Sequence, residues 1–170
     1  MSESRLPDNV SPALARFVDV LCMYDLERFG PQLGSLLAGP KSRLDERTIM
    51  FRLAEHAIHV SAVQTLEACD RVTDAGRLRN LAPITDPFTA SVARHAVDKL
   101  EGRPLVHARD AALFAAGDDA DRTAPGRTAE HAAYAIAETA AACVSAEDAR
   151  KVYDAASELL AVLRTGPAVA

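Results

Sequence analysis

The chain has 170 residues, of which 49% are hydrophobic and 25% are charged, so it is long enough to form one domain with a buried core. Its net charge of −5 argues against a nucleic-acid partner, because binding to phosphates needs clustered Lys and Arg. Trp is absent and only 5% of the residues are aromatic, so the core must be built mainly from Leu, Val, Ile and Ala.

The cysteines Cys22, Cys69 and Cys143 are isolated and form no CxxC pair. Three scattered thiols are typical of a reducing compartment and not of a disulfide framework. The first residues carry no apolar stretch of the kind found in signal peptides, and no apolar run approaches the length of a membrane span. We therefore expect a cytoplasmic protein that does not enter a membrane and needs no cofactor.

Capping residues and helically spaced apolar residues predict helices along the whole chain. Ser11-Pro12, Asp86-Pro87 and Ser145 are expected to begin helices, and Ser42–Asp45 has the pattern of a capping box. Gly30-Pro31 is expected to end the first helix. The predicted helices cover 12–29, 32–38, 45–73, 86–102, 104–116, 128–144 and 146–164, and residues 76–83 are expected to be a connection.

No run of Val, Ile, Thr and aromatic residues alternates with period two, so we expect no β-sheet. The fold class predicted is all-α, an irregular bundle or orthogonal array of about six or seven helices in a single domain over 1–170. Residues 1–10 and 166–170 are expected to fray. The acidic stretch 117–127, which contains Gly and Pro, is expected to be a mobile loop.

Histidines supply the first candidate site. His56, His95 and His131 follow similar short sequences, and three imidazoles from three helices would form an open metal site. Their positions on the helical wheel differ, which disfavours a shared site. A smaller metal site would use His56 and His59, which share a helix at i, i+3 spacing. No HExxH pattern is present, and the simpler interpretation is a boundary pair with His56 inside and His59 exposed.

Charged residues within apolar helix faces supply the second candidate site. Asp25 and Arg28 interrupt the apolar face of the first helix, and Glu67 shares a helix face with Val60. Unpaired buried charges are costly, so such groups line a site or form pairs. The ligand-binding interpretation is a polar pocket between the first and third helices that consists of Asp25, Arg28, His56 and Glu67. The structural interpretation is an Asp25–Arg28 pair and one bond between helices.

No catalytic residue can be assigned, because the sequence contains neither a GxSxG elbow nor a phosphate-binding loop. Tyr24, Tyr134 and Tyr153 are expected to have their rings in the core and their hydroxyls at its edge. The stretch Phe88–Ala116, with Leu-Glu-Gly-Arg-Pro at its centre, resembles Ala-rich helical immunity proteins of bacteria. This likeness covers a small part of the chain and assigns no site residue, so no family is identified.

The leading prediction is a non-enzymatic, all-helical protein-interaction module of bacterial type, such as an adaptor, inhibitor or immunity-type protein. It would bind a protein partner or form a homodimer through a helix face or through the 117–127 loop. The Ala-rich segment Ala129–Ala142 would permit close helix docking, either inside the bundle or across a dimer. The alternative is a small-molecule- or metal-binding helical bundle, with or without enzymatic activity.

Overall fold

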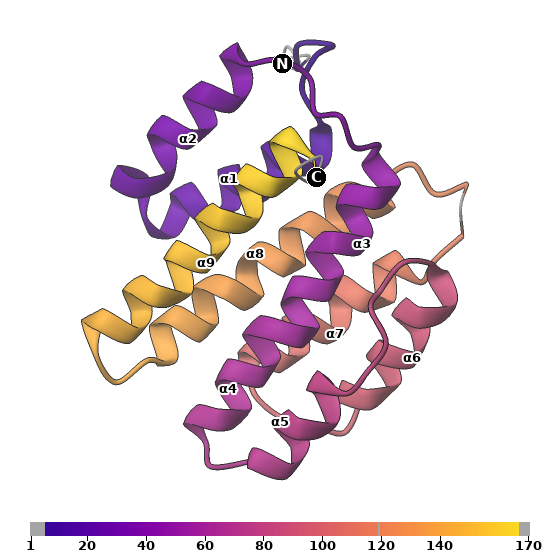
Figure 1. Ribbon diagram of the computed structural model, residues 1–170, viewed down its shortest axis with the longest axis vertical. Helices are drawn as coiled ribbons and strands as arrows, with labels where there is room; N and C mark the ends of the chain where they lie inside the picture. The colour runs from indigo at the N-terminus through magenta and orange to yellow at the C-terminus, as the bar shows by residue number, and fades with distance from the viewer. Residues whose placement is uncertain (1–5, 119, 167–170) are drawn as a thin grey trace.

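The structure is a computed structural model that describes residues 6–118 and 120–166 (Figure 1). Within these ranges the regular structure is entirely helical and contains no strand, which confirms the predicted all-α class. In chain order the elements are α1 (Pro12–Tyr24), α2 (Leu26–Ala38), α3 (Glu46–His56), a π-helical turn η1 (Ala57–Ala62), α4 (Val63–Ala68), α5 (Val72–Arg79), α6 (Pro87–Val97), α7 (Arg103–Ala115), α8 (Ala124–Ala142) and α9 (Ala146–Thr165). The elements α3, η1 and α4 follow one another without a break.

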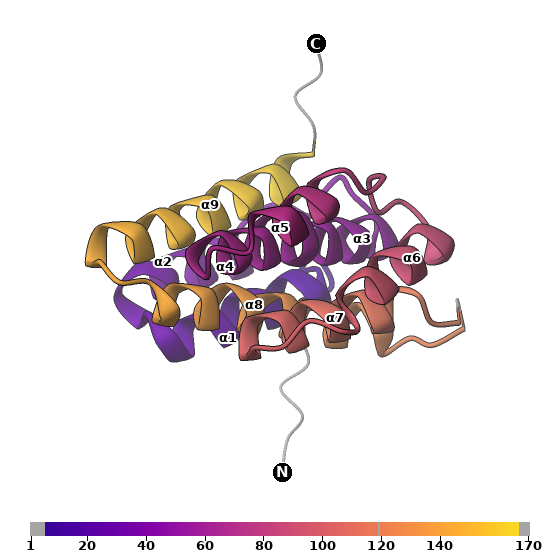
Figure 2. The same cartoon turned by 90° about the horizontal axis from the view of Figure 1, so that it is seen from below.

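The helices are arranged in two layers (Figure 2). In that view α1, α7 and α8 form one layer, while α3, α4, α5 and α9 lie above them. The Ala-rich α8 packs against α1 and α7 within its own layer and against α3, η1 and α9 of the other. It is therefore the central element of the molecule, and α2 and α6 pack at the outside against α1 and α7.

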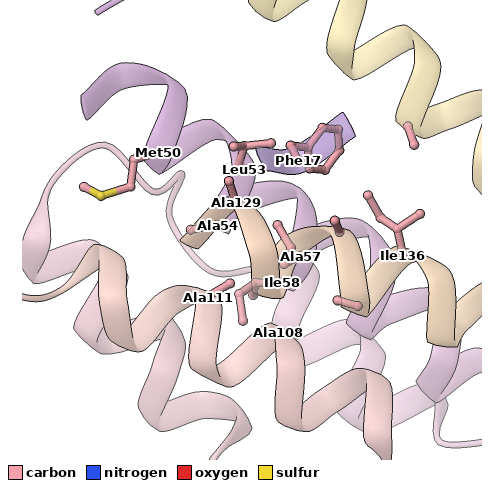
Figure 3. Packing of buried hydrophobic residues seen from close by; sticks show 14 of the residues in the cluster. Phe17, Met50, Leu53, Ala54, Ala57, Ile58, Ala108, Ala111, Ala129 and Ile136 are labelled. Atoms are coloured by element: carbon pink, nitrogen blue, oxygen red, sulfur yellow. The ribbon is translucent and has the colours of Figure 1, made fainter. Parts of the chain in front are cut away.

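The core around α8 is built from small side chains, as the composition predicts. Ala129, Ala132 and Ala133 of α8 are fully buried, and so are Ala108 and Ala111 of α7. Figure 3 shows this zone, where alanines of α3, α7 and α8 lie among the larger side chains of the core. Alanines let neighbouring helix backbones approach closely, so the core gains its contacts from many small groups.

The predicted first helix, 12–29, consists of two helices that meet at Asp25. Asp25 leaves the helical conformation with φ −146° and ψ 81°, and its Oδ1 accepts a hydrogen bond of 3.0 Å from the backbone N–H of Arg28. This is an N-cap, so a new helix begins at Leu26. Gly30-Pro31 does not end a helix, because α2 continues through Pro31 to Ala38.

The predicted third helix, 45–73, also has different limits. Asp45 itself is the N-cap, since its Oδ1 accepts from the backbone N–H of Thr48 at 2.7 Å, while the Ser42 hydroxyl donates to the carbonyl of Leu163 at 2.6 Å. The helical run ends at Ala68. Two residues later, Asp70 adopts a left-handed φ of 58°, a conformation that Asp tolerates better than most residues. The first part of the expected connection, residues 76–79, belongs to α5.

The helix α8 begins at Ala124, within the predicted loop 117–127, because Pro125 is well suited to a first helical turn. Of the expected frayed N-terminus, residues 6–10 are held by contacts: Val10 is buried, and the side-chain amide of Asn9 donates to the carbonyl of Gly39 at 2.8 Å. Gly166 is buried and ends α9, while 1–5 and 167–170 lie outside the described residues. None of the described helices is both long enough and hydrophobic enough to traverse a bilayer.

Candidate functional site

Asp25 and Arg28 join α2 to α9. The Nε of Arg28 lies 3.6 Å from Oδ2 of Asp25, and its Nη1 pairs with the carboxylate of Asp154 on α9. The same guanidinium lies 5.9 Å from the ring centroid of Tyr153. The predicted i, i+3 pair is therefore present, and the bond between helices goes to Asp154.

His56 lies in a groove between α3 and α9, and Glu67 lies elsewhere. The groove has a volume of about 550 Å³ and is mainly apolar, with Leu44, Val60 and Leu159 among its lining residues. Burial lowers the pKa of the His56 imidazole from 6.5 to about 4. Glu67 is exposed on α4 and pairs with Arg79 of α5. The structure thus brings together Asp25 and Arg28, but it places His56 and Glu67 with other neighbours.

The histidines proposed as metal ligands adjoin the π-helical turn. His56 precedes the turn and His59 lies within it, and both residues are half-buried. The Nε2 atom of His59 is buried and has no hydrogen-bond partner among the described residues. Across the same residues, no three His, Cys, Asp or Glu side chains gather closely enough to hold a metal ion.

A π-helical turn is often found at functional sites, and here it is tied to α8 by hydroxyl groups. The Thr65 hydroxyl donates to the carbonyl of Ser61 at 3.0 Å and lies 3.1 Å from the hydroxyl of Thr139. The Thr139 hydroxyl in turn lies 2.7 Å from the carbonyl of Ala135, to which it donates. These contacts provide hydrogen-bond donors for the carbonyls of Ser61 and Ala135 inside the core, which gives the turn a structural role, although the Ser61 hydroxyl itself has no partner among the described residues.

A row of rings crosses the layer formed by α1, α8 and α7, and sequence analysis did not find it. We call it the aromatic row, and its members are Tyr24 of α1, Tyr134 and His131 of α8, and His107 and Phe114 of α7. Ring centroids are 6.2 Å apart for Tyr24 and Tyr134, 5.1 Å for Tyr134 and His107, 5.4 Å for His107 and His131, and 5.4 Å for His131 and Phe114. Except for Tyr24, which is exposed, each ring belongs to a half-buried residue.

The two histidines of the row meet through their Nδ1 atoms, which are 3.1 Å apart. Burial lowers the pKa of His107 from its usual 6.5, and the neighbouring His131 lowers it further. The sequence pattern grouped His131 with His56 and His95, whereas the structure places it beside His107, which belonged to no predicted site.

Charged pairs border the row. Arg16 of α1 and Glu130 of α8 are 3.1 Å apart, and Arg103 of α7 and Glu138 of α8 are 3.4 Å apart. Arg127 lies 5.2 Å from the ring centroid of Phe114, in cation–π contact at one end of the row. Both signs of charge are therefore present at the edge, and they are paired.

A cavity of about 600 Å³ opens at the Phe114 end of the row, between α1, α3 and the connection from α7 to α8. Its walls carry arginines and acidic residues together, and Met50 and Phe114 provide apolar surface. The cavity lies between the first and third helices, as the predicted polar pocket does, but other residues line it. Those residues are Pro12, Arg16, Glu46, Arg47, Met50, Phe114, Gly117, Asp118, Asp121, Arg122, Thr123, Ala124, Pro125, Gly126, Arg127 and Glu130.

Comparison of the chain with protein-family models, with curated proteins and with solved structures gave no match. Function is therefore inferred from the contacts of the described residues.

Proposed function

We propose that the chain is a non-enzymatic, cytoplasmic protein-interaction module of bacterial type, and that it binds a protein partner through the face of α1, α8 and α7. The observation that supports this function is the aromatic row. At its Tyr24 end the surface is apolar: Tyr24 is 44% exposed, and the neighbouring Met23 and Leu26 are 68% and 69% exposed. Tyr, Phe, Met and Arg are the residues most enriched in protein interfaces.

The use of aromatic residues adds to this argument. The chain has only five Phe and three Tyr and no Trp. Phe17, Phe29 and Phe51 are buried in the core, where they stabilise the fold. Tyr24, Tyr134 and Phe114 instead lie together on one face, where partial exposure lessens their contribution to folding. Binding energy in interfaces is concentrated in such aromatic groups once a partner covers them.

The thiols favour a non-enzymatic role. Burial raises the pKa of Cys22 and of Cys143, and a nearby carboxylate raises each further. A raised pKa reduces the thiolate fraction, and the thiolate is the reactive form. Neither residue therefore has the environment of a catalytic nucleophile.

The charges around the row favour a partner with an apolar contact surface. Arg16 pairs with Glu130 and Arg103 with Glu138, so the edge presents no uniform charge for an acidic or a basic ligand. We propose a partner that places apolar side chains over Tyr24 and Tyr134, within a polar rim.

Site-specific photo-crosslinking tests this function. A photoreactive amino acid replaces Tyr24 in one variant and Val72 in a control, since Val72 is 65% exposed on α5 in the other layer. Both proteins are produced in the native host and irradiated. We expect a discrete adduct from position 24 and none from position 72. An adduct of twice the chain mass would identify a second copy as the partner. If neither position gives an adduct, or both give the same ones, the proposed face is wrong.

The cavity beside Phe114 supports a second candidate function, binding of a small molecule. Its volume of about 600 Å³ is within the range of ligand pockets, and its mixed polar and apolar walls suit a small polar molecule. Native mass spectrometry of protein purified from its host tests this candidate. A defined mass that is released on denaturation supports it, and a spectrum of the bare chain opposes it.

A further inference from the structure

The contact between His107 and His131 has a property that neither proposed function uses. A separation of 3.1 Å between the two Nδ1 atoms is a hydrogen-bond distance, and such a bond needs a donor on one side and an acceptor on the other. A neutral imidazole carries its proton on one ring nitrogen only. The two neutral rings must therefore be opposite tautomers, one with Nδ1–H and the other with Nε2–H.

We propose that the pair His107–His131 holds a single proton between its Nδ1 atoms, and that uptake of a proton by both rings separates them and alters the binding face of α7 and α8. The pair is thus a pH-sensitive element within the aromatic row. Its effect on partner binding rests on the proposed function, whereas its titration does not.

The physical reason is that two protonated imidazoles have no favourable contact through Nδ1. Each ring would then direct an N–H group at the other, and two positive charges would face each other at hydrogen-bond distance. The singly protonated pair has no such conflict, because one Nδ1–H donates to the free Nδ1 of the other ring. Charge-assisted bonds of this kind are stronger than neutral ones, so the first proton tightens the contact.

The neighbouring groups do not remove this repulsion. Glu138 of α8 and Asp110 of α7 favour the charged form of His107, and Arg103 opposes it. Glu138 is already paired with Arg103, and Asp110 is bonded to Arg109 at 2.9 Å. On α1, the guanidinium of Arg16 is paired with Glu130 of α8 at 3.1 Å.

Aromatic rings complete the surroundings of the pair. Phe114 stacks on His131, and the ring of Tyr134 lies at 5.1 Å from His107. These surfaces hinder water from stabilising a second charge. In agreement with this, burial is the main cause of the lowered pKa of His107, and His131 is the second.

Because the pair lies within the aromatic row, a change in its protonation affects the other rings of the row. His107 contacts both Tyr134 and His131, so it links the Tyr24 end of the aromatic row to the Phe114 end. The pair also joins α7 to α8, which pack closely along their lengths. Separation of the two rings would remove one of the two contacts at the centre of the row and leave the edge-on contact of His131 with Tyr134, whose ring centroids are 6.3 Å apart.

Nitrogen-15 NMR of the histidine rings tests the proposal on the purified, untagged chain. We expect opposite tautomers for His107 and His131 near neutral pH. On acidification we expect two separate protonation steps for the pair. In the variant His131→Gln, His107 should titrate in one step and at a higher pH than the second step of the pair. His107→Gln gives the reciprocal test on His131.

Several results would overturn the proposal. One is a single titration step for both rings, and another is the same tautomer on both rings. Added Zn²⁺ provides a further test. If the chain binds it stoichiometrically, and if His131→Gln abolishes this binding while His95→Gln retains it, the pair is a metal site. The photo-crosslinking yield from position 24 should fall on acidification when His131 is present and much less when the same photoreactive variant also carries His131→Gln. If a crosslink forms but its yield does not follow the histidine titration, the regulatory step fails while the proposed function stands.

Discussion

At the scale of single residues, His56 makes the stability of the folded state depend on pH. Its folded-state pKa of about 4 lies below the ordinary value of 6.5, so the native state binds this proton less readily than the unfolded chain does. Above pH 6.5 both states are neutral at this residue, and no penalty arises. As the pH falls from there to about 4, only the unfolded chain takes up the proton, and stability is lost through that window.

We predict that this residue lowers the free energy of unfolding by about 1–2 kcal/mol between neutral pH and the acid end of the window, because the half-buried ring keeps some contact with water. Urea unfolding at a series of pH values measures it. His56→Leu should show a clearly weaker pH dependence than wild type. Parallel pH curves for wild type and His56→Leu would contradict the buried, neutral state.

At the scale of helices, the sequence predicted where many elements begin. Ser11, Asp86 and Ser145 each accept a backbone hydrogen bond at the start of a helix, as expected. The interruption at Asp25 was missed because the apolar spacing continues from α1 into α2, so periodicity alone reads one helix. In the sequence Asp25 interrupts an apolar helix face, and in the structure it is the N-cap of α2.

The capping role of Asp25 can be separated from a ligand-binding role. Asp25→Ala should lower the free energy of unfolding by about 1 kcal/mol, because the N–H of Arg28 loses its acceptor. Asp25→Asn should retain most of the stability, since Asn is as good an N-cap as Asp. Chemical denaturation of the three proteins measures this. Equal losses in both variants would show that the charge, and not the cap, is what matters.

The π-helical turn provides another prediction at this scale. Thr139→Val removes the hydroxyl that lies against Thr65 and the carbonyl of Ala135 inside the core. We expect a loss of about 1 kcal/mol in unfolding free energy, typical of a buried hydrogen bond. Thr165→Val is the matched control, because the Thr165 hydroxyl makes the same i−4 bond, at 2.9 Å to the carbonyl of Ala161, on the surface. Similar losses at the two positions would contradict a special role for the turn.

At the scale of the whole molecule, the fold class could be predicted but the aromatic row could not. Helical periodicity and the absence of strand patterns are local properties, and they indicated an all-α protein. The row needs three helices to lie side by side in a particular order. His107 and His131 are far apart in the sequence, and nothing local to either residue shows that their rings meet. The rings of Tyr24 and Tyr134 were expected in the core with their hydroxyls at its edge, but Tyr24 is exposed and Tyr134 is half-buried, and the expectation did not reveal that they adjoin each other.

The alanines of α8 make the packing of the molecule testable. Ala133 is fully buried and Ala141 is exposed on the same helix. Ala133→Leu should cost about 1–3 kcal/mol, because the closely packed neighbours must move to admit the larger side chain. Ala141→Leu should change stability by less than about 0.5 kcal/mol, as most surface substitutions do. Thermal and urea unfolding measure both, and a neutral Ala133→Leu would mean that α8 packs more loosely than described.

The central position of α8 has a consequence for the order in which the molecule is assembled during translation. The helix follows α1, α3 and α7 in the chain and packs against all three. Until the ribosome has released residues 124–142, the sides of these helices that face α8 have no lasting cover, so the nascent polypeptide must remain open or associate transiently with a chaperone. Completion of this single alanine-rich segment then allows both layers to close around it.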